Sequence, residues 1–338
     1  MIPNLCSFVG DTPLVELEVS FDNAAIRLFA KLEMFNPGGS IKDRPALFMI
    51  RQAMADGKIT KASHLVESSS GNLAIAIAMI ARQMKLEFTA VIDPNITKSN
   101  RELIETYGGK IELVDEKDQE GGYLRSRISR VRQLLDELPN AVWLNQYANP
   151  DNRRSHYEGV GAEIVRDMPI EPTHAFIGVS TCGTIMGVAR RLREAWPTVR
   201  IVAVDVVGSV IFGSPGGKRR LPGIGASRVP EQLDTREIDE VVYVTDWESI
   251  LGCHRLVREE GLLAGGSSGS IIAAIEKMAP RLPRGAVIVT IMPDRGERYL
   301  DTVYNRNWLS ESDRVRRPLD ESHRVLTRFR ELQSVNRS

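Results

Sequence analysis

The fold is decided by the segment HLVESSSGNLAIAIAMIARQMKLEFTAVI, which occupies residues 64–92. Its first residues, His64–Glu67, are typical of a short strand, and Asn72–Gln83, rich in Ala, Ile and Met, is typical of a helix. Phe88–Ile92 follows as a second strand, rich in β-branched and aromatic residues. A strand, a long helix and another strand predict a βαβ unit, in which a right-handed crossover joins two parallel strands.

The same alternation continues on both sides of this segment. We expect further strands at Ile26–Leu32, Lys110–Val114, Thr173–Val179, Arg200–Asp205 and Ala286–Met292, and further helices at Pro45–Asp56, Lys98–Tyr107 and Gly183–Trp196. Two such runs, joined near Asn145–Asn152, predict an α/β chain with two open twisted sheets. Sites in such sheets lie beyond the carboxyl ends of the strands.

The composition excludes several classes of protein. The 338 residues are enough for two domains, and the 44 basic residues balance the 44 acidic ones, so we expect no nucleic-acid partner. The longest apolar run, near Leu73–Ala81, is too short to span a bilayer, and the start of the chain has no signal pattern. The three cysteines and five histidines are scattered, which predicts no metal site and a cytoplasmic protein.

Three turns rich in glycine and hydroxyl groups stand out. They are Glu67–Leu73 (ESSSGNL), Val179–Ile185 (VSTCGTI) and Ala264–Ser270 (AGGSSGS), and each is expected to follow a strand and to open a helix. Glycines let the backbone approach a ligand closely, and amides at a helix N-terminus bind anions. One such turn is an ordinary loop, but three together favour a site that binds a phosphate and a carboxylate.

A fourth motif, Asn36–Arg44 (NPGGSIKDR), places Lys42 after a turn and at the start of a predicted helix. A lysine in such a place is usually a solvated surface residue. A helix N-terminus also disfavours the ammonium form, which suits a lysine to Schiff-base chemistry.

These motifs, in this order, resemble those of the cysteine synthase family of pyridoxal-phosphate enzymes. The resemblance covers residues from about 8 to 305, and other parts of it are Gly10–Leu14, Gln146–Pro150, Leu221–Gly225 and Gly296–Leu300. It implies a fold of the tryptophan synthase β-subunit type (fold-type II) and a homodimer. It also implies a larger cofactor-binding domain from residues 1–40 and 150–305, a smaller movable domain from residues 41–149, and a C-terminal helix or tail over residues 306–338.

The resemblance assigns roles to individual residues. Lys42 would form the internal aldimine with pyridoxal 5'-phosphate, Asn72 would bind the ring hydroxyl, and Ser267 would face the pyridine nitrogen. A neutral hydroxyl at that nitrogen suits β-elimination and replacement. The remaining assignments are the phosphate loop, formed by Ser180, Thr181, Cys182, Gly183 and Thr184, and the site of the substrate α-carboxylate, formed by Ser69, Ser70, Asn72 and Gln146.

Departures from an ordinary cysteine synthase narrow the expected substrates. Ser180 replaces a glycine, Tyr147 replaces a phenylalanine, and Arg228 and Arg295 stand where the family has uncharged residues. Arg127 adds another cation. Sulfide needs none of these groups, whereas a phosphorylated donor and a carboxylate-bearing acceptor would, since arginine pairs bidentately with both. Any one of these arginines is equally well explained as a solvated surface residue.

The detailed match is to the branch of the family that joins O-phospho-L-serine to L-glutamate through an aminoacrylate. The product, N-(2-amino-2-carboxyethyl)-L-glutamate, is a precursor of 2,3-diaminopropionate in siderophore biosynthesis. Within that branch we expect Arg127, Tyr147 and Ser180 to accept glutamate and Arg228 to bind the phosphate of phosphoserine. The alternatives are a cysteine synthase that uses O-acetylserine or O-phosphoserine with sulfide, and a non-catalytic regulator, which the intact Lys42 disfavours.

Overall fold

The computed structural model describes residues 4–21, 25–118 and 122–312. The chain divides into two compact units. Unit 1 comprises the residues up to Asp11 together with Asn36–Ser155, and unit 2 comprises Thr12–Phe35 together with the chain from His156 onward. The predicted α/β chain with two open sheets is confirmed, and each unit contains one of them.

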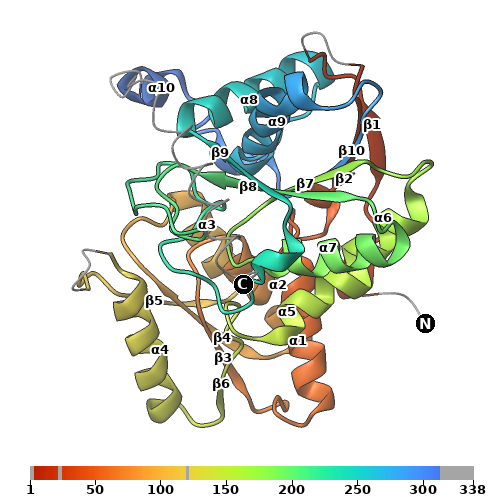
Figure 1. The fold of residues 1–338 in the computed structure, drawn as a ribbon. Helices are drawn as coiled ribbons and strands as arrows, with labels where there is room; N and C mark the ends of the chain where they lie inside the picture. The colour runs from red at the N-terminus through yellow and green to blue at the C-terminus, as the bar shows by residue number, and fades with distance from the viewer. Residues whose placement is uncertain (1–3, 22–24, 119–121, 313–338) are drawn as a thin grey trace. The chain divides into compact units, whose positions relative to one another are not determined.

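Unit 1 contains a parallel four-stranded sheet in the order β5-β4-β3-β6 (Figure 1). Its strands are β3 (His64–Ser68), β4 (Glu87–Ile92), β5 (Lys110–Leu113) and β6 (Ala141–Trp143). The three strands predicted in this region are confirmed. The sequence did not predict β6, because a half-buried strand of three residues at the edge of a sheet is too short to show a period.

Helices cover both faces of this sheet. They are α1 (Asp43–Ala55), α2 (Asn72–Met84), α3 (Lys98–Thr106), α4 (Leu124–Glu137) and α5 (Pro150–His156), and a 3₁₀ turn, η1 (Leu5–Phe8), precedes them. Because successive side chains of a strand point to opposite faces, Leu65 of β3 packs with residues of α1 and α2, whereas Val66 packs with Val131 and Leu134 of α4. The apolar run Leu73–Ala81 is the buried body of α2.

Unit 2 contains a six-stranded sheet in the order β1-β2-β10-β7-β8-β9. Its strands are β1 (Leu14–Leu17), β2 (Arg27–Leu32), β7 (His174–Gly178), β8 (Arg200–Val206), β9 (Glu240–Val244) and β10 (Val287–Met292). All neighbours are parallel except β1, which runs antiparallel to β2. The four strands predicted in this unit are confirmed, and β1 and β9 are additional.

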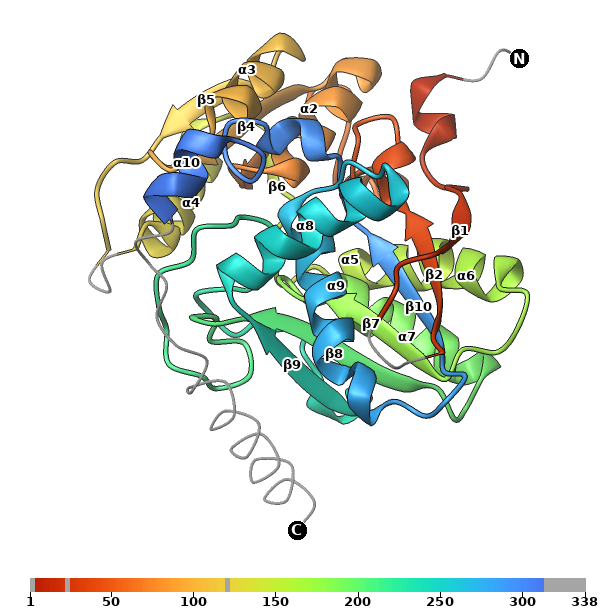
Figure 2. The same ribbon diagram turned by 90° about the horizontal axis from the view of Figure 1, so that it is seen from above.

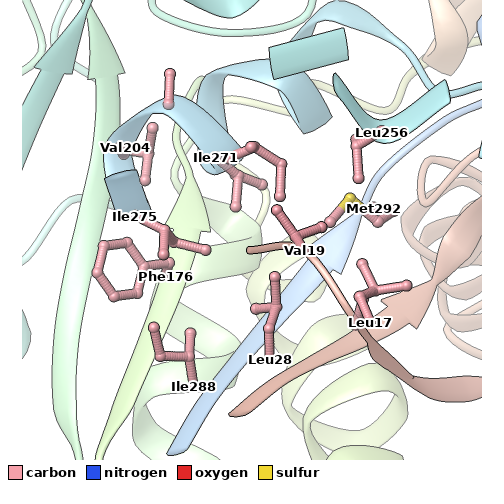
Figure 3. Close-up of a cluster of buried hydrophobic side chains, with 14 of the residues drawn as sticks. Leu17, Val19, Leu28, Phe176, Val204, Leu256, Ile271, Ile275, Ile288 and Met292 are labelled. Carbon is pink, nitrogen blue, oxygen red and sulfur yellow. The ribbon is translucent and has the colours of Figure 1, made fainter. Parts of the chain in front are cut away.

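Helices pack on both faces of the second sheet, with α9 on one face and α7 on the other (Figures 1 and 2). The helices of unit 2 are α6 (Ala162–Asp167), α7 (Gly183–Ala195), α8 (Asp246–Glu260), α9 (Gly266–Met278) and α10 (Arg306–Ser312), with short helical turns η2 (Glu33–Phe35), η3 (Tyr157–Gly161, a π-helix), η4 (Thr235–Glu237), η5 (Ala279–Arg281) and η6 (Gly296–Tyr299). Figure 3 shows Ile271 and Ile275 of α9 in a buried cluster with Phe176, Leu28 and Ile288 of the sheet. Residues 313–338 of the predicted tail lie outside the described residues.

One expectation about the turns is wrong. The turn Ala264–Ser270 was expected to follow a strand, but it connects α8 to α9. A capping box at Thr245 begins α8, and Gly261, in the left-handed region at φ 64°, ends it. Between Gly261 and α9, Ala264 forms only an isolated bridge with Arg295.

Candidate active site

Lys42 lies at the N-terminus of α1, in a loop that the sequence NPGGSIKDR folds tightly. The Asp43 carboxylate accepts a hydrogen bond of 2.5 Å from the Gly38 amide, and a Cβ on Gly38 would lie 2.4 Å from Asp43 Oδ1. Gly39 has a φ of 80°, and its amide donates to Asn36 O at 2.7 Å. The helix begins at Asp43, two residues before the predicted start, so Lys42 is its N-cap residue and is half-buried.

The loop between β3 and α2 carries Ser69, Ser70 and Asn72. Ser69 is buried, and Asn72 is the first residue of α2. A Cβ added to Gly71, the N-cap residue of this helix, would meet nothing within 4 Å. The amides in the first turn of a helix have no intrahelical partners, so this open N-terminus can bind an anion.

Arg127, on α4, is directed to the same loop. Its Nη1 donates to Ser70 Oγ at 2.9 Å and lies 3.2 Å from Asp93 Oδ2, and its side chain is only 15% exposed. Asp93 follows β4 directly, at the carboxyl end of the sheet. Asn100 Nδ2 holds the Ser70 carbonyl at 3.2 Å. The structure therefore brings Ser70 and Arg127 into direct contact and adds Asp93, which sequence reasoning missed.

Gln146 and Tyr147 lie in the turn after β6. Gln146 is buried, and its carbonyl accepts a hydrogen bond of 2.6 Å from Asn152 Nδ2. Asn145 has a φ of 52°, in the left-handed region that asparagine tolerates better than most residues. Tyr147 is half-buried.

In unit 2, Ser180–Cys182 lie in the loop between β7 and α7, and Gly183 and Thr184 are the first two residues of α7. Cys182, with a φ of 62°, is the N-cap residue of α7, and Thr181, Cys182 and Gly183 are buried. Thr184 Oγ1 lies 3.2 Å from Nε2 of the buried His156, at the start of the π-helix. A left-handed residue before a long helix, flanked by hydroxyl side chains, turns successive amides toward one point. This cradle fits a phosphate group.

Ser180 is tied to the segment that contains Arg228. Its hydroxyl donates to Gly225 O at 3.1 Å, and the Gly225 amide donates to Val179 O at 2.7 Å. Gly225 has a φ of 71°, and a Cβ there would lie 2.6 Å from Val206, so only glycine fits. Arg228 is ion-paired with Glu231 three residues later.

Ser267 is buried in the first turn of α9. The approach to this helix is crowded, because a Cβ on Gly265 would lie 2.0 Å from Asp294 Oδ1. Tyr299 donates a hydrogen bond of 2.5 Å to Asp294 Oδ2. Burial raises the pKa of the nearby Cys253 thiol to about 12, so this cysteine is not a nucleophile at neutral pH.

The expected site residues are divided between the units. Unit 1 carries Lys42, Ser69, Ser70, Asn72, Arg127, Gln146 and Tyr147, and unit 2 carries Ser180–Thr184, Arg228 and Ser267. Arg295, which also departs from the family pattern, is exposed and donates to Met34 O at 2.8 Å. Within the described ranges, no cluster of His, Cys, Asp and Glu side chains could hold a metal ion, and no helix could cross a membrane.

These features are typical of a pyridoxal-phosphate-dependent enzyme: two open α/β units, a lysine at a helix N-terminus, and a turn before α7 that fits a phosphate group. The chain belongs to the family described as "Pyridoxal-phosphate dependent enzyme", whose model matches residues 5–294. The residues present fit the cofactor: Lys42 offers the amine, and the Ser180–Thr184 loop offers amides and hydroxyls for its phosphate.

Curated relatives and solved structures agree with this class. The chain is 53% identical over 302 residues to N-(2-amino-2-carboxyethyl)-L-glutamate synthase of Ralstonia nicotianae, with 89% of each chain covered. A second enzyme of that name, from Cupriavidus metallidurans, is 53% identical over 305 residues, again covering 89% of each. Among solved structures, an O-acetylserine-dependent cystathionine β-synthase from Helicobacter pylori is similar, with a TM-score of 0.82, 30% identity, and 90% of this chain and 99% of that one covered.

Proposed function

We propose that this enzyme joins O-phospho-L-serine to L-glutamate and releases phosphate, forming N-(2-amino-2-carboxyethyl)-L-glutamate. The observation that carries the proposal is the 53% identity to two enzymes of that name over 89% of the chain. In the same proposal the enzyme acts as a cytoplasmic homodimer and supplies 2,3-diaminopropionate for siderophore biosynthesis.

The proposed chemistry is a replacement at the β-carbon of the donor. When bound, the cofactor supplies an electron sink for the electron pair left at the α-carbon. Lys42 Nζ would remove the α-proton, and the Cβ–O bond would break as phosphate departs with its electron pair. The amino nitrogen of glutamate would then form the new Cβ–N bond and lose a proton, and Lys42 would return a proton to the α-carbon.

The remaining roles are those that the resemblance to the cysteine synthase family implies. Ser69, Ser70, Asn72 and Gln146 would hold the α-carboxylate of the donor and align its Cα–H bond for Lys42. Ser180–Thr184 would bind the cofactor phosphate, and Ser267 would face the ring nitrogen.

Glutamate would bind at Arg127, Tyr147 and Ser180. The guanidinium of Arg127 is held by Asp93 and Ser70 on one side, which fixes its plane for a second carboxylate. Ser180 Oγ uses its proton on Gly225 O, so its oxygen remains an acceptor for the ammonium or amine of glutamate.

The test separates the donor step from the acceptor step. We expect the Tyr147→Phe and Ser180→Gly variants to bind phosphoserine as the wild type does, with the same change in the absorbance of the cofactor when phosphoserine is added. Both variants should lose most of the phosphate release that depends on glutamate. Mass measurement of the product identifies the acceptor. If both steps fall together in both variants, the acceptor roles are wrong. If the wild type consumes sulfide and ignores glutamate, the enzyme is a cysteine synthase.

Arg228 is tested by comparing donors. We expect Arg228→Gln to raise the KM for phosphoserine and to leave the KM for O-acetylserine unchanged, because only the first donor carries a phosphate. Equal changes for the two donors would remove Arg228 from the phosphate site.

A further inference from the structure

Glu67, the fourth residue of β3, is a buried acid whose neighbours are hydrogen-bond donors. It is 1% exposed, and its Oε1 accepts from the Ser68 amide at 2.9 Å and from Trp143 Nε1 at 3.2 Å. Burial raises its pKa to about 7, and the Trp143 indole and the backbone amides of Ser68, Gln146 and Asn145 oppose that rise. Its Oε2 is buried with no hydrogen-bond partner among the described residues.

These donors come from two separate parts of unit 1. Ser68 opens the loop that carries Ser69 and Ser70, and Asn145 and Gln146 form the turn after β6. Both segments belong to the proposed site of the donor α-carboxylate. One buried carboxyl group therefore faces the backbone of both.

The turn that contains Gln146 is anchored by several side chains. Asn145 adopts a left-handed conformation, which asparagine tolerates better than most residues. Asn152 Nδ2 holds the Gln146 carbonyl at 2.6 Å, and Asn149 Nδ2 holds the Leu144 carbonyl at 2.9 Å. These two asparagines bind carbonyl groups of the turn, and Glu67 is the side chain that faces its amides.

We propose that Glu67 is a positioning residue for phosphoserine, the donor substrate. Its carboxyl group fixes the Ser68–Gly71 loop and the Asn145–Gln146 turn relative to each other, so that both bind the same α-carboxylate. The inference rests on the proposed role of these loops in binding that carboxylate. Glu67 does not touch the substrate in this scheme. It acts through the backbone of Ser68 and Gln146.

A carboxylate suits this place better than an amide. Both of its oxygens accept hydrogen bonds, whereas glutamine has one accepting oxygen and an NH₂ group that only donates. In Glu67→Gln, the amide oxygen can keep the Ser68 amide and the Trp143 indole only if the NH₂ group takes the place of Oε2 and turns toward the Asn145 and Gln146 amides. A hydrogen-bond donor then stands against other donors, so the turn and the loop hold phosphoserine less well.

The test uses the holoenzyme and follows its absorbance during titration with phosphoserine, without an acceptor. We expect Glu67→Gln to raise the dissociation constant for phosphoserine about tenfold, the equivalent of one hydrogen bond to a charged group. The kcat at saturating phosphoserine should change less than the KM, because Lys42 is untouched. Cofactor affinity should stay at the wild-type value. Glu87→Gln, at the exposed start of β4, is the matched control and should bind phosphoserine like the wild type.

Two results would overturn the inference: wild-type donor affinity in Glu67→Gln, or a loss of cofactor affinity that parallels the loss of donor affinity. If Glu67→Gln does not fold, Trp143→Phe serves as the second variant. It removes only the hydrogen bond from the indole to Oε1, and it must still raise the dissociation constant for phosphoserine. A wild-type enzyme that responds to O-acetylserine but not to phosphoserine would contradict the proposed function alone. The Glu67 variants would then be measured with O-acetylserine.

Discussion

Replacing Asp205 by asparagine should change how the stability of the enzyme depends on pH. Asp205 is fully buried near the end of β8, where its Oδ1 accepts from the Val206 amide at 2.8 Å and its Oδ2 has no partner among the described residues. Burial raises its pKa from 3.8 to about 7, against the opposing effects of the Val206 amide, the Ser209 hydroxyl and Arg219.

This difference in pKa fixes the sign and size of the effect. The folded protein binds the proton of Asp205 more tightly than the unfolded chain, so the contribution is fully present below about pH 4 and is lost as pH rises through about 7. The whole difference corresponds to about 4 kcal/mol, of which roughly 2–3 kcal/mol falls between pH 5 and pH 8. Asp205→Asn keeps the acceptor for Val206 and cannot titrate, so that part of the pH dependence should vanish.

The assay is urea unfolding of wild type and variant at pH 5 and pH 8, with saturating cofactor. Because both proteins carry the same cofactor, its own pH dependence cancels in the comparison. Asp301→Asn, on the exposed surface, is the control and should keep the wild-type dependence. An Asp205→Asn variant that differs from the wild type by the same free energy of unfolding at both pH values would refute the reasoning.

Three further predictions concern the helices that position the site. Gly269→Ala would place a Cβ 2.0 Å from the Ser249 carbonyl oxygen, a backbone atom that cannot step aside, and should cost about 1–3 kcal/mol in a thermal melt; Gly178→Ala, with contacts of 3.6 Å and more, should be milder, and equal melting temperatures would contradict the argument. Thr245→Ala removes the capping box of α8 and should lower the urea midpoint by the equivalent of about 1 kcal/mol, so an unchanged midpoint would show that this helix end does not limit stability. Lys42→Ala should lose the absorbance of covalently attached cofactor with an unchanged far-ultraviolet circular dichroism spectrum, whereas a retained band would assign the attachment to another lysine.

Local patterns in the sequence were sufficient for most of the fold. The helix at Asn72–Gln83 could be predicted because its apolar pattern is long and uninterrupted. The strand-to-helix turn at Val179–Ile185 could be predicted because glycine and hydroxyl residues cluster where a strand ends. The turn at Ala264–Ser270 has the same composition but follows a helix. Glycine and small hydroxyl residues occur wherever the backbone must pass close to another group, so they do not show which kind of element precedes the turn.

The contacts that position the site could not be predicted in the same way. Arg127 meets Asp93 across 34 residues of chain, and Thr184 meets His156 across 28. No local period links such partners, because they meet only after the sheets have formed. The best available signal was position: Asp93 directly follows β4, and the carboxyl ends of parallel strands share one edge.

Two buried acids also occupy equivalent positions near the carboxyl ends of strands. Glu67 and Asp205 each stand one residue before the end of a strand, and each accepts a hydrogen bond from the amide of the next residue. Burying a carboxyl group is unfavourable unless its hydrogen bonds are made elsewhere, so such residues are poor choices for stability alone. At each of these two places the acid accepts from the amide of the last residue of the strand. Ser209, whose hydroxyl opposes the rise in the pKa of Asp205, accepts from the Ala226 amide at 3.1 Å, next to the Gly225 carbonyl that binds Ser180. Both units therefore place a buried acid next to the end of a strand, ahead of a segment that carries proposed substrate contacts.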